Sequence, residues 1–299
     1  MDGESDFKEN KIAIIGLGLI GGSLGLSLKY GAPDLKIIGI DREEIINKAI
    51  IRGAVDRGTD CLQEGIKDAD IVIIATPVKV ILNLFPKIKP FLKEDCLVTD
   101  TGSTKVEILA EAEKAFSNKV DFIGGHPIAG LEKGGIEHAT PALFRKKPYL
   151  VTPKKGNNVT ANQKLSSLIN HIGAWEMEIG SQEHDQIVAL ISHLPHLIAV
   201  IMTNMLGLWA KEMNGEDYFK INGNAFQDMT RVATSPFNIW RDIYETNTEY
   251  TIYFLEQLEK WLAKTKEKIA RNPSELEEDF EMAKSFKEKM LNIKVKGIE

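Results

Sequence analysis

Residues 11–28 constrain the fold of this chain more than any other segment. Their sequence runs from β-branched apolar residues through the pattern Gly-x-Gly-x-x-Gly into residues with helical apolar spacing. This order is that of the strand, turn and helix of a dinucleotide-binding unit. Gly16 permits the tight turn, Gly18 lets a pyrophosphate approach the backbone, and Gly21 lets the helix pack closely on the strand. The open N-terminus of the helix then offers unpaired N–H groups to the phosphates.

An acidic residue follows the next predicted strand. Residues 36–40 form that strand, and Asp41 comes about 20 residues after the last glycine, where an acid binds the ribose hydroxyls of the cofactor. Its carboxylate would repel a 2′-phosphate, so the sequence predicts NAD rather than NADP, although the neighbouring Arg42 could accommodate that phosphate. The expected cofactor contacts are Gly16, Gly18, Leu19, Ile20, Gly21, Asp41, Arg42, Thr76, Pro77 and Ser103.

The composition is that of an ordinary globular protein, with 299 residues, 43% of them hydrophobic and 27% charged. The net charge of −6 argues against a nucleic-acid surface. Residues 1–10 are polar and acidic, unlike a signal peptide, and we find no apolar run that approaches membrane-spanning length. Cys61 and Cys96 provide neither a disulfide framework nor metal-ligand spacing. We therefore expect a cytoplasmic protein with a disordered tail at residues 1–10, no metal and no membrane contact.

The chain changes character near residue 180. Residues 11–180 alternate short apolar strands with helix-length segments, which indicates a parallel sheet covered on both faces. Residues 181–299 show helical spacing only, with Ser181 as the expected cap of the first helix and Pro195 as an expected kink. Further helices are expected at about 224–233, 236–246 and 248–270, and a last one from Pro273, capped by Asn272, through Met290. The prediction is an α/β Rossmann-type nucleotide-binding domain, residues 11–180, followed by an all-α domain, residues 181–299.

Two polar residues that directly follow predicted strands are candidates for chemistry, because ligands of open α/β sheets bind at the carboxyl ends of strands. His126 is surrounded by glycines and, with a reference pKa of about 6.5, can accept a proton near neutral pH. It could equally be a loop histidine that bonds to the backbone. Ser103 follows residues 96–100 and could donate to a substrate hydroxyl or to the nicotinamide carboxamide. Alternatively, Ser103 or Thr104 caps the helix that begins near Lys105.

Polar residues also interrupt the apolar spacing of the first long helix. His193 and His196 lie three residues apart beside Pro195, so they can share a helix face in a ligand pocket or as hydrogen-bonded core positions. A metal site is disfavoured, because no acidic or cysteine partner lies at ligand spacing. His184 and Asp185, at the start of the same helix, are expected to be surface groups that complement the helix dipole.

Arg231 is the candidate anion-binding residue. It lies among apolar residues of a predicted helix, where a guanidinium needs an anion because desolvating the charge alone is costly. That anion is either a substrate carboxylate or an internal partner, Asp228 or Asp242.

Taken in order, these segments resemble the prephenate dehydrogenases, with arogenate-using enzymes as close relatives. The resemblance extends over about residues 11–247. Its motifs are Gly16-Leu-Gly-Leu-Ile-Gly21-Gly-Ser, Ala75-Thr-Pro-Val78, Asp100-Thr-Gly-Ser103-Thr-Lys105, Gly125-His126-Pro127-Ile-Ala-Gly130, His193-Leu-Pro-His196, Asp228-Met-Thr-Arg231-Val-Ala and Trp240-Arg-Asp-Ile243. Many dehydrogenases share the glycine motif, whereas the Gly-His-Pro and Thr-Arg-Val-Ala combination is far more specific.

The resemblance implies NAD-dependent oxidative decarboxylation of prephenate to 4-hydroxyphenylpyruvate, in tyrosine biosynthesis, by a homodimer that forms through its helical domain. By motif, His126 would accept the proton of the ring hydroxyl, and Ser103 would hydrogen-bond near that hydroxyl and the nicotinamide. Arg231 would bind a substrate carboxylate, and His196, with His193 beside it, would help to hold the pyruvyl side chain. The alternatives are an arogenate dehydrogenase, a β-hydroxyacid dehydrogenase that uses a lysine of its helical domain, and a non-enzymatic NAD-sensing protein.

Overall fold

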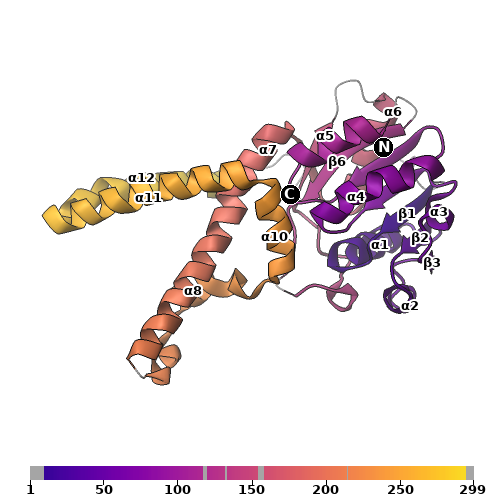
Figure 1. Cartoon of the computed structure of the whole chain (residues 1–299). Helices are drawn as coiled ribbons and strands as arrows, with labels where there is room; N and C mark the ends of the chain where they lie inside the picture. Colours follow the sequence, from indigo (N-terminus) through magenta and orange to yellow (C-terminus); the bar gives the residue numbers. More distant parts are fainter. Residues whose placement is uncertain (1–9, 117–119, 132, 154–157, 214, 294–299) are drawn as a thin grey trace.

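The computed structural model describes residues 10–116, 120–131, 133–153, 158–213 and 215–293 (Figure 1). The expected disordered tail at residues 1–10 lies, apart from Asn10, outside these residues. Residues 10–180 form a layered α/β structure, called here the sheet half. The described part of residues 181–293 forms helices and their connections, called here the helical half.

The sheet half is built around one sheet, which has eight strands in the described residues in the order β3-β2-β1-β4-β5-β6-β7-β8. The strands are β1 (Lys11–Ile15), β2 (Lys36–Ile40), β3 (Arg57–Thr59), β4 (Ile71–Ile74), β5 (Cys96–Asp100), β6 (Val120–Pro127), β7 (Pro148–Pro153) and β8 (Trp175–Glu178). Strands β1 to β6 are parallel, and Ile12 of β1 pairs with Ile37 on one side and Ile71 on the other. Because β1 lies between β2 and β4, the order reverses there and opens a crevice at the carboxyl ends of the strands.

Strand β7 contradicts the expectation of an entirely parallel sheet. It pairs antiparallel with β6, with His126 opposite Leu150, and β8 is then parallel to β7. Between β6 and β7 the described residues form no α-helix, only turns and the short 3₁₀ helix η2 (Ile136–His138), and the Ile128 N–H bonds to the Pro148 carbonyl at 2.9 Å. A parallel return needs a crossover, usually a helix, so this chain re-enters the sheet in the opposite direction.

Helices cover both faces of the sheet, as the continuous apolar strands predict (Figure 1). They are α1 (Leu19–Gly31), α2 (Glu43–Ile51), α3 (Leu62–Ile66), α4 (Val78–Ile88), α5 (Val106–Ala115) and α6 (Val159–His171). Successive residues of β1 point to opposite layers, so Ile14 packs in one core with Leu24 of α1 and Ile15 packs in the other with Phe85 of α4. Burying each of these side chains stabilises the fold by about 1.5–3 kcal/mol.

The helical half starts with an irregular helix. Its elements are α7 (Ser181–Val188), the π-helical segment η3 (Ala189–His193), α8 (Leu194–Glu212), η4 (Glu216–Ile221), α9 (Asn224–Thr230), η5 (Arg231–Thr234), α10 (Phe237–Thr246), α11 (Thr248–Arg271), η6 (Pro273–Leu276) and α12 (Glu277–Asn292). The expected cap at Ser181 is wrong, because Gly180 is the cap and Ser181 is already helical. The irregularity expected at Pro195 takes the form of η3, which directly precedes the first turn of α8. A proline ring clashes with the carbonyl four residues earlier in an α-helix, and the wider π turn relieves that clash.

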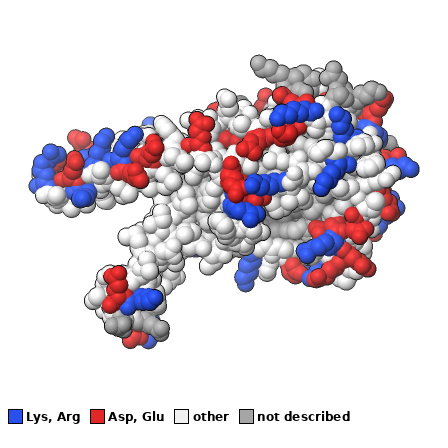
Figure 2. Space-filling view, viewed as in Figure 1, with Lys and Arg blue, Asp and Glu red and all other residues white. Residues whose placement is uncertain are grey.

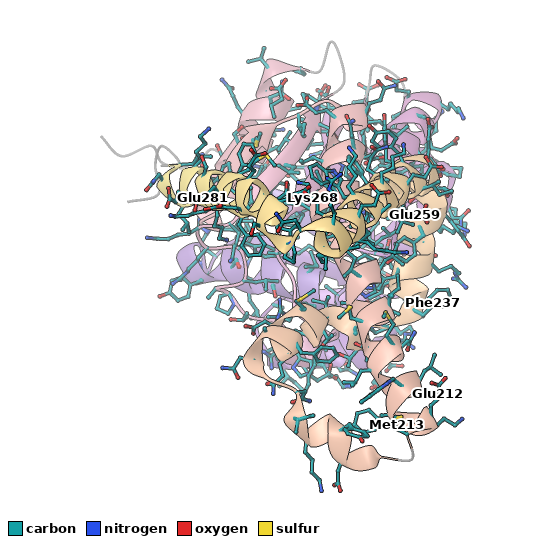
Figure 3. All side chains as sticks on the ribbon, turned by 90° about the vertical axis from the view of Figure 1, so that its left-hand side faces the viewer. Glu212, Met213, Phe237, Glu259, Lys268 and Glu281 are labelled. Atoms are coloured by element: carbon teal, nitrogen blue, oxygen red, sulfur yellow. The ribbon has the colours of Figure 1, made fainter. Side chains whose placement is uncertain are left out.

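Two arms project from the body of the molecule, one formed by α8 and the residues after it, the other by α11 and α12 (Figure 1). An ion pair between Lys268 and Asp279, 2.7 Å long, joins α11 to α12, and Glu212 and Met213 mark the far end of the α8 arm (Figure 3). Charged side chains gather at the tips of the arms, whereas the surfaces between the arms are mostly uncharged (Figure 2). Exposed apolar side chains on the arms are Ile201, Met205, Leu208, Trp209, Ile252, Tyr253, Trp261, Leu262, Ile269, Phe280, Met282, Phe286 and Met290.

The helical stretch Ser181–Glu212 is long and apolar enough to cross a membrane by length and composition. The expectation that no apolar run approaches this length is therefore wrong. Core and interface helices of globular proteins pass the same test, and this stretch begins with the buried polar side chains of His184 and Asp185. Those two side chains pack against the sheet half, as described below.

Candidate active site

A cavity of about 660 Å³ lies between the two halves, at the carboxyl ends of the central strands. The turns after β1, β4 and β5 and the end of β6 form its floor, and residues of η3 and α10 close the opposite side. This volume is in the range of small-molecule and cofactor sites, and the position is where open α/β sheets bind ligands.

The glycine turn has the geometry expected of a phosphate-binding turn. Gly16 has a φ of +91°, which favours glycine, and a Cβ on Gly21 would lie 1.9 Å from the Gly16 carbonyl oxygen. A Cβ on Gly18 would meet no described atom within 4 Å, so the space above the turn is open. The first N–H groups of α1 therefore face the cavity, which Gly18, Leu19 and Ile20 line.

The other expected cofactor residues divide into two groups. Thr76, Pro77 and Ser103 line the cavity, and the buried Thr76 Oγ1 has no hydrogen-bond partner among the described residues. Asp41 and Arg42 lie beyond the described lining of this cavity, at the end of β2. The Leu17 and Arg42 N–H groups, each at 2.7 Å, hold the Asp41 carboxylate, while the Arg42 side chain is exposed. These residues fit a dinucleotide whose ribose lies at Asp41.

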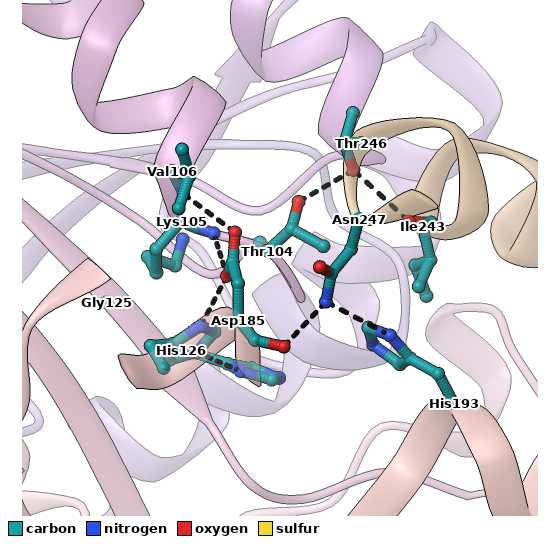
Figure 4. A network of polar contacts seen from close by, with 12 residues as sticks. Thr104, Lys105, Val106, Gly125, His126, Asp185, His193, Ile243, Thr246 and Asn247 are labelled. Atoms are coloured by element: carbon teal, nitrogen blue, oxygen red, sulfur yellow. Dashed lines mark hydrogen bonds and ion pairs between the residues drawn. The ribbon is translucent and has the colours of Figure 1, made fainter. Parts of the chain in front are cut away.

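Neither Ser103 nor Thr104 caps α5, contrary to one of the readings of the sequence. The cap comes from the helical half: the Lys105 N–H and the Val106 N–H donate to the two Asp185 carboxylate oxygens, at 2.6 and 2.9 Å (Figure 4). Thr104 instead contacts the Thr246 hydroxyl at 2.8 Å, so Ser103 remains as the hydroxyl that lines the cavity.

A fully buried ion pair lies beneath the Ser103 turn. Lys105 Nζ contacts Asp100, and both side chains are inaccessible to solvent. The Asp100 carboxylate also accepts the Gly102 N–H at 2.7 Å and the Gly125 N–H at 3.2 Å. Asp100 thus holds the turn before Ser103 and the strand residue just before His126 at the same time.

His126 lies at the end of β6, half-buried at the wall of the cavity. Its Nδ1 is 2.9 Å from His184 Nε2, and His184 Nδ1 is 2.7 Å from Asp185 Oδ1. His126 is therefore bonded to another side chain, and the alternative of a loop histidine that bonds only to the backbone is wrong. His184 and Asp185 are 0% and 1% exposed, so the expectation that they are surface groups is wrong.

Sequence reasoning missed this pair, although a signal for it was present. His184 and Val188 are four residues apart, so helical periodicity places them on one face, and both are buried. The spacing of apolar residues alone predicted Ile187 as the first residue of the buried face, but Ile187 is exposed.

Burial is the main reason why the pKa values of the histidines at this site are low. For His126 burial is the main cause of a pKa well below the usual value, and His184, Lys105 and His193 act in the same direction. Burial also lowers the pKa of His184, against the opposing effect of Asp185, and lowers that of His193 to about 4. All three rings are consequently neutral at pH 7, the state in which an imidazole accepts a proton.

His193 and His196 differ in their access to the cavity. His193 lines it, and its Nδ1 is 3.3 Å from Asn247 Nδ2. His196 stacks on Trp240 with ring centroids 3.5 Å apart and contacts the Tyr244 hydroxyl at 2.9 Å through Nδ1. Among the described lining residues Trp240 appears and His196 does not, so His196 lies behind that indole ring.

Arg231 does not have the environment that the sequence suggested. It begins η5 rather than continuing α9, and its side chain is exposed in this single chain instead of packed among apolar residues. It is absent from the described lining of the cavity, whereas Ser235, four residues later, is part of it. Of its two expected internal partners, Asp242 is buried, with its carboxylate 3.5 Å from Arg241 and 3.4 Å from the Lys79 N–H at the start of α4.

Known proteins resemble this chain along both halves. Residues 24–177 match the family "Prephenate dehydrogenase, nucleotide-binding domain", and residues 180–288 match "Prephenate dehydrogenase, dimerization domain". A prephenate dehydrogenase of Lactococcus lactis subsp. cremoris is 37% identical over 283 residues, which are 94% of this chain and 77% of that protein.

Two solved structures have the same architecture over nearly the whole chain. Prephenate dehydrogenase from A. aeolicus, in complex with hydroxyphenyl propionate and NAD⁺, matches with a TM-score of 0.85 at 31% identity, over 94% of this chain and 98% of that one. Arogenate dehydrogenase from Synechocystis matches with a TM-score of 0.79 at 28% identity, over 94% of this chain and 99% of that one.

Proposed function

This chain belongs to the prephenate dehydrogenase family, and we propose that it catalyses the NAD-dependent oxidative decarboxylation of prephenate to 4-hydroxyphenylpyruvate in tyrosine biosynthesis. The observation that carries the proposal is the cavity in which His126 and Ser103 face the glycine turn of α1. A base, a hydroxyl and a dinucleotide site open into one space, which is what proton removal coupled to hydride transfer requires.

His126 acts as the general base. Its Nδ1 is occupied by His184, so Nε2 accepts the proton of the ring hydroxyl. A dinucleotide held at the glycine turn would supply the hydride acceptor for the carbon that bears this hydroxyl. The ring carboxylate leaves as carbon dioxide, and its electron pair aromatises the ring. The phenolic oxygen then takes the proton back from His126, so the residue ends the cycle as it began. Ser103 donates to the reacting oxygen or to the nicotinamide and orients the group that it contacts.

Binding of the substrate dianion needs positive charge from outside the described lining of the cavity. That lining contains His126 and His193 but no Lys, Arg, Asp or Glu. We assign the carboxylate contact to Arg231, because η5 leads into the lining residues Ser235 and Pro236. His193 contacts the substrate from η3, and His196 supports the pyruvyl side chain through Trp240.

The relatives described above favour prephenate over arogenate. The prephenate dehydrogenase of Lactococcus lactis is 37% identical to this chain, whereas the arogenate dehydrogenase from Synechocystis is 28% identical. We therefore propose prephenate as the preferred substrate. NADH absorbance after the purified protein is mixed with NAD and either substrate tests both assignments. We expect a higher kcat/KM with prephenate; a higher value with arogenate reverses the preference, and no NADH from either refutes the activity.

We further propose that the protein is a cytoplasmic homodimer. We also propose that the boundary between the two domains of each chain lies at residue 180. The two arms expose more apolar surface than a monomer usually presents, and they belong to the segment that matches a dimerisation domain. Light scattering is expected to give twice the chain mass of 33.3 kDa. A mass of 33.3 kDa at micromolar concentration contradicts the dimer.

A further inference from the structure

The Asp185 carboxylate determines which ring nitrogen of His126 carries the proton, because His184 connects the two residues by hydrogen bonds. An ionised Asp185 only accepts hydrogen bonds, so His184 Nδ1, 2.7 Å away, must carry the proton of that contact. His184 Nε2 then presents a lone pair and accepts from His126 Nδ1 at 2.9 Å. His126 Nε2 is left without a proton, which is the tautomer that a base acting through Nε2 requires.

Further hydrogen bonds keep Asp185 an acceptor, so the donor direction from His126 through His184 to Asp185 is not easily reversed. Its two oxygens accept the backbone N–H groups of Lys105 and Val106 at the start of α5, and its carbonyl oxygen accepts Asn247 Nδ2 at 2.7 Å (Figure 4). A rotated or protonated carboxyl group would place a donor against those backbone donors. The start of α5 also favours a negative charge at this point.

We propose that His184 and Asp185 are positioning residues that set the tautomer of His126 and stabilise its ring after it takes the proton. We call the hydrogen-bonded series His126–His184–Asp185 the relay. The inference rests on the proposed function, since a proton is taken up by His126 only in that reaction. Both residues come from α7 of the helical half, whereas His126 comes from β6 of the sheet half. The base is therefore complete only when the two halves are docked, and the α5 cap and the relay form together.

The groups around His126 show what the Asp185 carboxylate has to offset. Burial opposes a positive charge on the His126 ring, and so do His184, Lys105 at the start of α5 and His193 on η3. Asp100 neutralises Lys105 from β5, and Asp185 is the carboxylate that the relay places behind His126. Loss of the relay would leave the protonated ring facing Lys105 and His193 without that compensation.

The test replaces His184 in two ways. His184→Phe keeps a ring of similar size but removes the acceptor for His126 Nδ1, whereas His184→Gln can still accept that N–H. We expect His184→Phe to lower kcat about 10²-fold with little change in NAD affinity, and His184→Gln to retain most of the activity. Gln186→Ala, an exposed change on the same helix, is the matched control and should behave as wild type.

A readout independent of activity is the ¹⁵N NMR spectrum of the histidine rings near pH 8. Wild-type His126 should carry its proton on Nδ1, and His184→Phe should shift it toward the Nε2–H form. The inference is refuted if wild-type His126 is the Nε2–H tautomer, or if folded His184→Phe, judged by its thermal melt and NAD binding, keeps wild-type kcat. A wild-type protein with the Nδ1–H tautomer but no turnover of prephenate supports the tautomer assignment and overturns the proposed function instead.

Discussion

Replacing Lys105 with methionine removes a positive charge that is buried against Asp100. Both side chains are 0% exposed, so solvent does not screen the pair, and methionine occupies a similar volume. Removing one partner of a buried ion pair costs about 3–5 kcal/mol, because the other charge stays buried. Asp100 keeps the Gly102 and Gly125 N–H groups at 2.7 and 3.2 Å, so we expect a loss at the lower end, about 3 kcal/mol.

Urea unfolding at fixed protein concentration measures this loss, since association changes the apparent stability of a dimer. Adding Asp100→Asn removes the stranded charge, so the double variant should be more stable than Lys105→Met alone. The control, Lys114→Met, is exposed beside Glu111 and should change the free energy of unfolding by less than about 0.5 kcal/mol. A loss below about 1 kcal/mol for Lys105→Met, or a double variant no more stable than the single one, would refute the reasoning.

Four further predictions concern chemistry and pH. His126→Asn cannot accept the proton, so kcat should fall by roughly 10²–10⁴-fold with NAD affinity nearly unchanged, and near-normal turnover would place the base elsewhere. Because burial, together with Lys105 and two neighbouring histidines, lowers the pKa of His126, the acidic limb of kcat/KM in the wild type should lie below pH 6.5; a limb above that value contradicts a neutral ring at pH 7. Arg231→Gln should weaken prephenate binding by about 1.5–3 kcal/mol while the fold survives, whereas an unfolded variant with normal KM in the active remainder indicates a structural ion pair. Asp41 should make NAD the better cofactor, and equal turnover with NADP would exclude that role.

The cofactor half of the site is readable from sequence because its determinants are local. Gly16, Gly18 and Gly21 act through the backbone of one turn, and the structure places that turn as the motif predicts. His126 and Ser103 line the cavity for a similar reason, since each follows its strand within a few residues. Their roles in the reaction stay proposals.

The direction of β7 was not readable in the same way. Apolar strands predict a buried sheet, but the sense of a strand depends on how the chain returns to it. Here residues 128–147 return without an α-helix in their described part, so the sheet is mixed. The long apolar helix at Ser181–Glu212 is a second such case, because apolar length does not say whether protein or lipid covers it.

By itself, the sequence determined the class of fold, the dinucleotide turn and the strand ends that carry polar groups, because these depend on neighbours in the chain. Only the tertiary structure decided that His184 and Asp185 are buried behind His126, that Asp185 rather than Ser103 caps α5, and that Arg231 is exposed in this chain. Each of these depends on contacts between residues far apart in sequence, such as Val106 with Asp185. Periodicity identifies the faces of a helix, but only docking of the helical half on the sheet half selects which polar side chains those faces bury.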